Sequence, residues 1–370
     1  MLRRFFVSFS AALLVATLVA AVSVAAQSQT PAPKKATVAG GGAAAAAAAK
    51  FVAKKLPWGD PDISGNFTNK DESNTPFERP DEFAGRRIED VTPAELAAAV
   101  EQRKSNARVA AVYAGGGDRE RGVALGVPIH WLDNLDSANH RPWFVVDPPD
   151  GKIPPLTKEA VDRNAAIAKA REGRGLADSY IDRSSSDRCT ARKGTPAQAM
   201  TPGLYGNSYQ ILQTKDYVAI RYDMDGSRMI PIEGRGGARP HPGQKIRTYF
   251  GDATARWDGN TLVVDTTNFG DFVAYRGARS GLHFIERYTR TAPKTVEWSI
   301  TVEDPHTWAR PWTFSMPLTE DDGEPVFEYG CHEGNYGLRN ILSAGRSDDK
   351  KGIKSSNTAA TQGDLTEVEE

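Results

Sequence analysis

The sequence predicts a mainly β protein, in which an antiparallel meander curls into a closed or half-open β-barrel behind an N-terminal section that carries two helices. The 370 residues include 34 glycines and 23 prolines, and such a turn-rich chain favours many short strands over long helices. Short turn motifs recur between apolar segments, and within residues 295–303 every second position, from Val296 to Val302, is apolar. A meander of about seven or eight such strands is expected to close, because closure removes its edge strands.

The mixed N-terminal section covers residues 57–174. A capping box at residues 92–95 predicts the start of a helix that continues to Ala111. Thr157 is placed to cap a second helix over residues 158–172. Between the helices, residues 143–146 are apolar and predict a short strand that ends at a proline-containing turn.

The section 175–345 is expected to form the barrel itself. Its strands pair as hairpins, because each apolar segment is followed by a short turn such as Asp225-Gly226. The expected strand pairs are 217–223 with 228–233, 254–257 with 261–267, 284–290 with 295–303, and 312–318 with 326–331.

Both ends of the chain are predicted to lie outside this single domain of residues 57–345. Residues 1–26 have the basic start, apolar stretch and small-residue cleavage site of a signal peptide. We therefore expect a periplasmic or secreted protein without stable membrane insertion after cleavage near Ala26; an uncut membrane anchor is the alternative. Residues 27–56 predict a low-complexity tether, and residues 346–370 a disordered tail.

The charges exclude some classes of partner. With 46 lysines and arginines against 47 acidic residues, the net charge is -1, and no basic stripe of the kind that binds nucleic acid is present. The chain has neither a nucleotide-binding fingerprint nor a close pair of metal ligands, so no cofactor and no metal site is predicted. A metal held by the distant histidines His241, His306 and His332 stays open, as does the oligomeric state.

The two cysteines, Cys189 and Cys331, are expected to form one disulfide, because an even count in an oxidising compartment favours pairing. Two buried free thiols are the first alternative. A nucleophilic Cys331 beside His332 is the second, although adjacent residues of a strand point to opposite faces.

The stretch from Asp304 to Trp312 contains a carboxylate, an imidazole, a guanidinium and two indoles at the end of a predicted strand. We interpret it as a candidate catalytic site, with Asp304 and His306 for proton transfer and Arg310 for an anionic or carbonyl group. Trp308 and Trp312 would then be ligand-binding residues that wall an apolar pocket. The alternative is a proline-fixed turn whose tryptophans belong to the core.

A second candidate cluster follows Cys331. His332 and Tyr336 are its catalytic candidates, and Gly334 between them predicts a turn. If His332 points into the barrel, Glu333 points away, so the two residues are not an obvious dyad. A functional and a structural interpretation both stay open.

Three further residues are candidates for ligand binding. His241 belongs to the Gly- and Arg-rich loop 234–243, which is either a loop that closes over a pocket or a plain hairpin loop. Arg276 and Glu286 are candidates because a charged side chain facing a barrel interior is costly unless it is paired or binds a ligand. An interior ion pair of Glu286 with Arg276 or Arg228 is expected.

Six motifs are distributed over residues 58–342: WGDPDISG at 58–65, VDPPDGKIP at 146–154, DRC at 187–189, WDGNTLVVDTTNF at 257–269, EDPHTWARPW at 303–312 and CHEGNY at 331–336. Together they resemble an uncharacterised family of secreted bacterial proteins. The resemblance implies an exported bacterial protein and carries over neither an activity nor a catalytic residue. In addition, DISGNF at 62–67 is similar to the Gly-x-Trp opening of lipocalin-like barrels, with Phe67 in place of tryptophan, which implies a lipocalin-like barrel.

The function that these features favour is an exported β-barrel protein that binds a small, partly apolar or aromatic molecule. The first alternative is a cofactor-independent acid–base enzyme on the same barrel, such as a lyase, isomerase or hydrolase. The second is a structural protein of the cell envelope, with the tether and the tail as spacers.

Overall fold

A computed structural model of the chain describes residues 51–114, 138–190 and 196–353, except for 204, 238, 244, 272 and 324. All of them belong to the unit Gly40–Glu370, whereas the other unit, Met1–Ala39, lies outside the described residues. The predicted signal peptide, most of the predicted tether and the end of the predicted tail (354–370) therefore also lie outside them.

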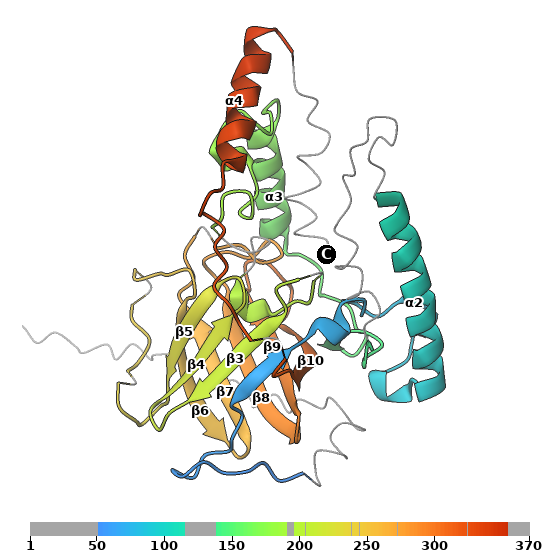
Figure 1. Cartoon of the computed structure of the whole chain (residues 1–370), viewed down its shortest axis with the longest axis vertical. Coiled ribbons are helices and arrows are strands. Elements are labelled where there is room, and N and C mark those ends of the chain that lie inside the picture. The colour runs from blue at the N-terminus through green and yellow to red at the C-terminus, as the bar shows by residue number, and fades with distance from the viewer. Residues whose placement is uncertain are drawn as a thin grey trace, which may run out of the picture. The chain divides into compact units, whose positions relative to one another are not determined.

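One sheet of ten strands forms the centre of the fold (Figure 1). Hydrogen-bonded neighbours follow one another in the order β5 (Gly226–Pro231), β4 (Tyr217–Tyr222), β3 (Ser208–Gln213), β1 (Gly65–Thr68), β10 (Trp312–Glu320), β9 (Thr295–Glu303), β8 (His283–Ala292), β7 (Thr261–Thr267) and β6 (Asp252–Asp258). A short strand, β2 (Val145–Asp147), pairs with β10 beside this path.

The strand order confirms the predicted antiparallel barrel and adds one feature to it. Strands β3 to β5 and β6 to β10 form two meanders, and β1 from the N-terminal section lies between β3 and β10 and joins them. The ends of the sheet, β5 and β6, approach each other just beyond β5, where Ile232 forms a parallel bridge with Ala255 and the Glu233 amide donates to the Ala255 carbonyl at 2.7 Å. The barrel is therefore nearly closed, with a seam between β5 and β6.

The barrel interior is filled largely by apolar side chains from alternating positions of the strands. In β9 the predicted alternation is confirmed, because every second residue from Val296 to Val302 is fully buried and the residues between them are partly exposed. Large aromatic residues such as Trp298 and Phe314 fill the space between strands, and their rings meet edge to face at a centroid distance of 5.4 Å.

One ion pair is buried within this apolar interior. Arg228 of β5 donates through Nη2 to both carboxylate oxygens of Glu286 in β8, at 2.6 and 2.7 Å, and the Tyr288 hydroxyl donates to the same carboxylate at 2.6 Å. Burial works to lower the pKa of Arg228, but the charge of Glu286 outweighs it and raises the pKa. Of the two partners considered for Glu286, the structure selects Arg228, and the pair spans the seam of the barrel.

The expected strand at residues 326–331 is wrong, because the structure has no strand there. The sheet offers it no vacant edge next to β10. Strand β10 already pairs with β9 along one side and with β1 and β2 along the other. Residues after β10 therefore leave the barrel, and Phe327 and Tyr329 are exposed.

Among the described residues, two helices lie between β1 and β3 as predicted, and a third follows β10. In α2 (Pro93–Ala114) the capping box is formed, with the Thr92 amide donating to the Glu95 carboxylate at 2.8 Å and the Glu95 amide to the Thr92 hydroxyl at 3.3 Å. In α3 (Lys158–Arg171) the Thr157 hydroxyl accepts from the Ala160 amide at 3.1 Å. Helix α4 (Gly337–Lys350) was not expected and crosses the predicted domain end at residue 345.

The other helical elements within the described ranges are single 3-10 turns, at Lys70–Glu72, Asp81–Phe83, Ile88–Asp90, Tyr180–Asp182 and Ala197–Ala199. Across the part of the chain that the structure describes, no helix combines the length and the apolar character needed to cross a membrane.

The predicted disulfide between Cys189 and Cys331 is confirmed, with a Cα–Cα distance of 5.6 Å. Neither cysteine is free, so the interpretations with buried thiols and with a nucleophilic Cys331 are wrong. The disulfide joins the segment before the barrel to the segment after it. These segments also meet where Arg346 of α4 donates through Nη1 to the Asp178 carbonyl at 3.0 Å.

Candidate functional site

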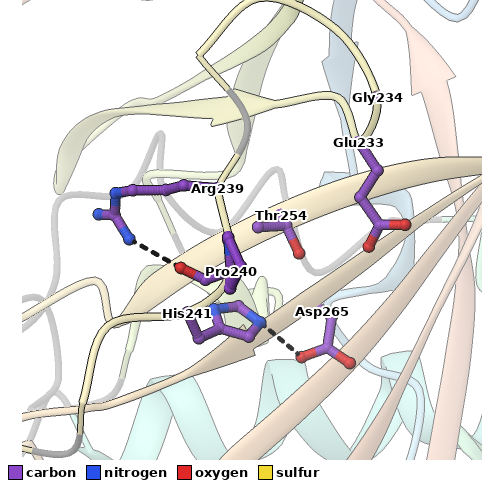
Figure 2. A pocket seen from close by; sticks show the side chains of 7 residues that line it. All are labelled: Glu233, Gly234, Arg239, Pro240, His241, Thr254 and Asp265. Atoms are coloured by element: carbon purple, nitrogen blue, oxygen red, sulfur yellow. Dashed lines mark hydrogen bonds and ion pairs between the residues drawn. The ribbon is translucent and has the colours of Figure 1, made fainter.

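A pocket of about 440 Å³ lies between strands β6 and β7 and the loop that follows β5. Leu262 and Val264 of β7 point into the core, so Asp265 points to the outer face of the sheet. Figure 2 shows Glu233, Gly234 and Asp265 on one side of the pocket and Arg239, Pro240 and His241 on the other. The side chains and backbone that line it belong to Glu233, Gly234, Arg239, Pro240, His241, Thr254 and Asp265.

Polar contacts hold the loop of residues 233–243 at both ends. Near its start, Arg235 donates through Nη2 to Asp60 at 2.8 Å and through Nη1 to the Lys215 carbonyl at 2.8 Å. Near its end, the Asn268 side chain donates to the Pro242 carbonyl at 2.9 Å. Gly234 and Gly237 turn the loop with positive φ angles of 72° and 88°, which only glycine adopts without strain.

Six side chains, alternately basic and acidic, form a chain of contacts, and three of them also line the pocket. Its members, here called the carboxylate–imidazole chain, are Arg239, Asp252, His241, Asp265, His283 and Glu303. They come from the loop and from the adjacent ends of β6, β7, β8 and β9, because neighbouring antiparallel strands bring these ends to one edge of the sheet.

The two imidazoles of this chain share one carboxylate. His241 Nε2 lies 3.3 Å and His283 Nε2 lies 3.1 Å from Asp265 Oδ1. Each Nδ1 faces a second carboxylate, at 2.6 Å from Asp252 for His241 and at 2.9 Å from Glu303 for His283. Both rings are thereby fixed in orientation, and Nε2 of His241 faces the pocket wall formed by Asp265.

The contacts between carboxylates and imidazoles shift the pKa values of His283 and Asp265. Burial works to lower the pKa of His283, but hydrogen bonds to Asp265 and Glu303 and their negative charges outweigh it and raise the pKa to about 9. Burial works to raise the pKa of Asp265, and its contacts with His283 and His241 lower it. At neutral pH His283 is therefore a cation that lies between the carboxylates of Asp265 and Glu303.

The free energy of unfolding is expected to fall as the pH rises from about 6.5 to about 9, by about 2–3 kcal/mol through His283 alone. The contribution is complete below the unfolded pKa of 6.5 and is lost as the pH passes through the folded value of about 9. Urea unfolding at a series of pH values measures it. His283→Gln should lack this part of the decline, and the exposed His332→Gln should keep it. Equal declines in both variants would show that His283 is not the group responsible.

The stretch from Asp304 to Arg310 anchors α3 and does not reach the pocket. Asp304 is buried, and its carboxylate accepts from the His306 amide at 3.0 Å and from the Thr307 hydroxyl at 2.7 Å. The His306 imidazole is exposed and contacts Glu159 of α3 at 3.0 Å, and this hydrogen bond raises the pKa of His306. Arg310 is exposed and pairs with Asp147 at 3.0 Å.

The other predicted site residues are dispersed. His332 and Tyr336 are exposed beside the disulfide, and no contact joins them to Asp304 or His306. Trp308 and Trp312 are buried in the core, where their rings meet edge to face at 5.5 Å. Of the predicted ligand-binding residues, the pocket contains His241, whereas Glu286 lies in the barrel interior and Arg276 in the loop between β7 and β8.

Sequence reasoning missed most of the side chains that surround His241. Asp265 was visible as one carboxylate within the apolar stretch TLVVDTT, and His283 as a histidine that opens a strand. The strand pairing that brings them to His241 was not visible. Across the described parts of the chain, no group of three or more His, Cys, Asp or Glu side chains is arranged to hold a metal ion, and this includes His241, His306 and His332.

The fold and the pocket together define an antiparallel β-barrel protein with a polar pocket on the outer face of its sheet. No protein-family model, curated protein or solved structure matches this chain. Its function is therefore argued from the geometry and charge of the pocket.

Proposed function

We propose that this chain binds a small organic cation in the pocket between β6, β7 and the loop 233–243. The charge balance around the pocket supports this. Four carboxylates, those of Glu233, Asp252, Asp265 and Glu303, face Arg239, His283 and His241. Even with both histidines protonated, the group carries one more negative than positive charge, which favours a cationic ligand.

Glu233 is the observation that carries the proposal. Its carboxylate lines the pocket and makes no ion pair or hydrogen bond with the described residues, whereas the carboxylates of Asp252 and Asp265 are both paired. A ligand ammonium group would form an ion pair with Glu233 and donate a further hydrogen bond to the Asp265 carboxylate. Pro240 offers an apolar surface for the remainder of the ligand, in keeping with a partly apolar molecule (Figure 2).

The scaffold suits a binding role, because loops fixed on a rigid barrel position binding residues accurately. The predicted signal peptide, the disulfide and the resemblance to secreted bacterial proteins extend the proposal to an exported protein. The ligand is then a molecule that the protein meets outside the cytoplasm.

Benzylamine, an organic cation with an aromatic part, is expected to raise the melting temperature of the protein in a thermal-shift assay, because a ligand of the folded state stabilises it. Glu233→Gln should weaken its binding about three- to tenfold, as expected for one partly solvated ion pair. Glu328→Gln is the matched control, because Glu328 is exposed and does not line the pocket. No shift with benzylamine or other primary amines, or equal affinity in both variants, would contradict the proposal.

A second candidate function is acid–base catalysis at the same pocket. The observation that favours it is the contact of 2.6 Å between His241 Nδ1 and Asp252, which orients the ring so that Nε2 lies at the pocket wall beside Asp265. Under this alternative, His241→Gln abolishes product formation from a mixed substrate library, followed by mass spectrometry. Equal product formation by His241→Gln would exclude it.

A further inference from the structure

Arg276 has two energetically unfavourable features, a left-handed backbone conformation and a buried charge. Its φ angle is +45°, in the left-handed region that non-glycine residues seldom adopt. The residue is also buried, with 8% of its surface exposed, yet no carboxylate of the described residues pairs with its guanidinium. A buried cation without an ionic partner is unfavourable unless neighbouring groups or a ligand stabilise it.

Aromatic rings and further hydrogen-bond donors surround Arg276, and no described carboxylate pairs with it. Its guanidinium carbon lies 3.9 Å from the centre of the Phe77 ring, a close cation–π contact. Phe77 meets Trp312 edge to face at 5.9 Å, and Tyr275 stacks on Trp312 at 6.2 Å. Phe314 completes this aromatic cluster at 4.9 Å from Phe77.

Two other buried donors belong to this cluster. The Trp312 indole nitrogen is buried without a hydrogen-bond partner among the described residues, and the Tyr275 hydroxyl, which the Arg276 guanidinium approaches as a donor, has no acceptor there for its own proton. Burial raises the pKa of Tyr275, and the nearby guanidinium of Arg276 partly opposes this, so the phenol stays protonated and remains a donor. Nearly all buried polar groups in proteins have a partner, so the open indole N–H of Trp312 and the phenol proton of Tyr275 favour an oxyanion bound beside Arg276.

We propose that Arg276 and Tyr275 bind the carboxylate of a small aromatic or apolar acid at this end of the barrel. A carboxylate fits the planar guanidinium through two parallel hydrogen bonds and accepts from the phenol as well. The left-handed backbone of Arg276 and Gly277 forms the tight turn between Tyr275 and Ala278, which are hydrogen-bonded to each other, and this turn holds the guanidinium beside Phe77. The site is separate from the pocket that contains His241, because the two share no residue.

Benzoate is the probe for this site, titrated into the full mature protein by calorimetry. Arg276→Met keeps the contact with Phe77 and removes the charge, and it is expected to weaken benzoate binding at least about tenfold. The same variant should keep or raise the melting temperature of the ligand-free protein, because an unpaired buried charge is removed. Arg279→Met in the same loop is the matched control and should bind benzoate as the wild type does.

Comparison with benzylamine separates this site from the proposed function. Benzoate binding should survive Glu233→Gln, and benzylamine binding should survive Arg276→Met. The inference is overturned if benzoate does not bind the wild type, or if Arg276→Met binds it with unchanged affinity. A lower melting temperature of ligand-free Arg276→Met would also count against it, because Arg276 would then have a structural partner. The three results that would overturn the inference do not depend on whether benzylamine binds.

Discussion

Replacing Glu286 by glutamine is expected to lower the free energy of unfolding by about 3–5 kcal/mol, the largest effect of any single substitution considered for this protein. Glu286 is fully buried and pairs with Arg228, which is 5% exposed. The substitution leaves the guanidinium buried without a counter-charge, and solvent cannot reach it to compensate.

The position of this pair makes it important for the barrel. Arg228 belongs to β5 and Glu286 to β8, so the contact reaches across the seam where β5 and β6 come together with one parallel bridge. Loss of the pair is therefore expected to loosen the seam first. Faster amide hydrogen exchange in β4 and β5 than in β9 would report this loosening.

A double replacement provides the control. Arg228→Met with Glu286→Leu removes both charges and fills a similar volume, so it should recover most of the stability that Glu286→Gln loses. Urea unfolding of the three proteins measures the differences. A loss in the double variant as large as that in Glu286→Gln would mean that side-chain volume, and not the unpaired charge, determines the effect.

Removing the disulfide is the second large perturbation. Cys189→Ser together with Cys331→Ser should lower the free energy of unfolding by about 4–5 kcal/mol, because the bond closes a loop with a sequence separation of 142. The loop encloses most of the barrel strands. Its closure therefore restricts the unfolded chain far more than any single hairpin does.

Reduction of the wild type tests the contribution of the disulfide to the free energy of unfolding without a mutation. Unfolding in urea with and without a thiol reductant should differ by the same amount as wild type and the double serine variant, and the variant should not respond to reductant. A variant as stable as the oxidised wild type would contradict the entropic account.

The sequence predicted the parts of the fold that depend on local patterns. Hairpin turns and the alternation of residues 295–303 were enough for β4 to β9, and the cap at Thr157 was enough for α3. The insertion of β1 between β3 and β10 was not predictable, because a four-residue strand gives no sign of its distant partners. The absence of a strand at 326–331 follows from the same insertion.

The candidate site was less predictable than the fold. His241 was named from its loop, but its contacts with Asp252 and Asp265 arise from strand register, which single residues do not reveal. The unusual stretch from Asp304 to Trp312 drew attention because polar and aromatic residues are adjacent in sequence. In the fold its buried carboxylate caps a turn, and its tryptophans complete the core.

The central claim is that an unpaired carboxylate in a net negative pocket selects a small organic cation. Calorimetric titration of benzylamine into the wild type and into Glu233→Gln, at low and at high salt, tests it most directly. We predict binding that weakens with salt in the wild type, and about three- to tenfold weaker binding in Glu233→Gln at low salt. The same dissociation constant for both proteins at low salt would contradict the claim.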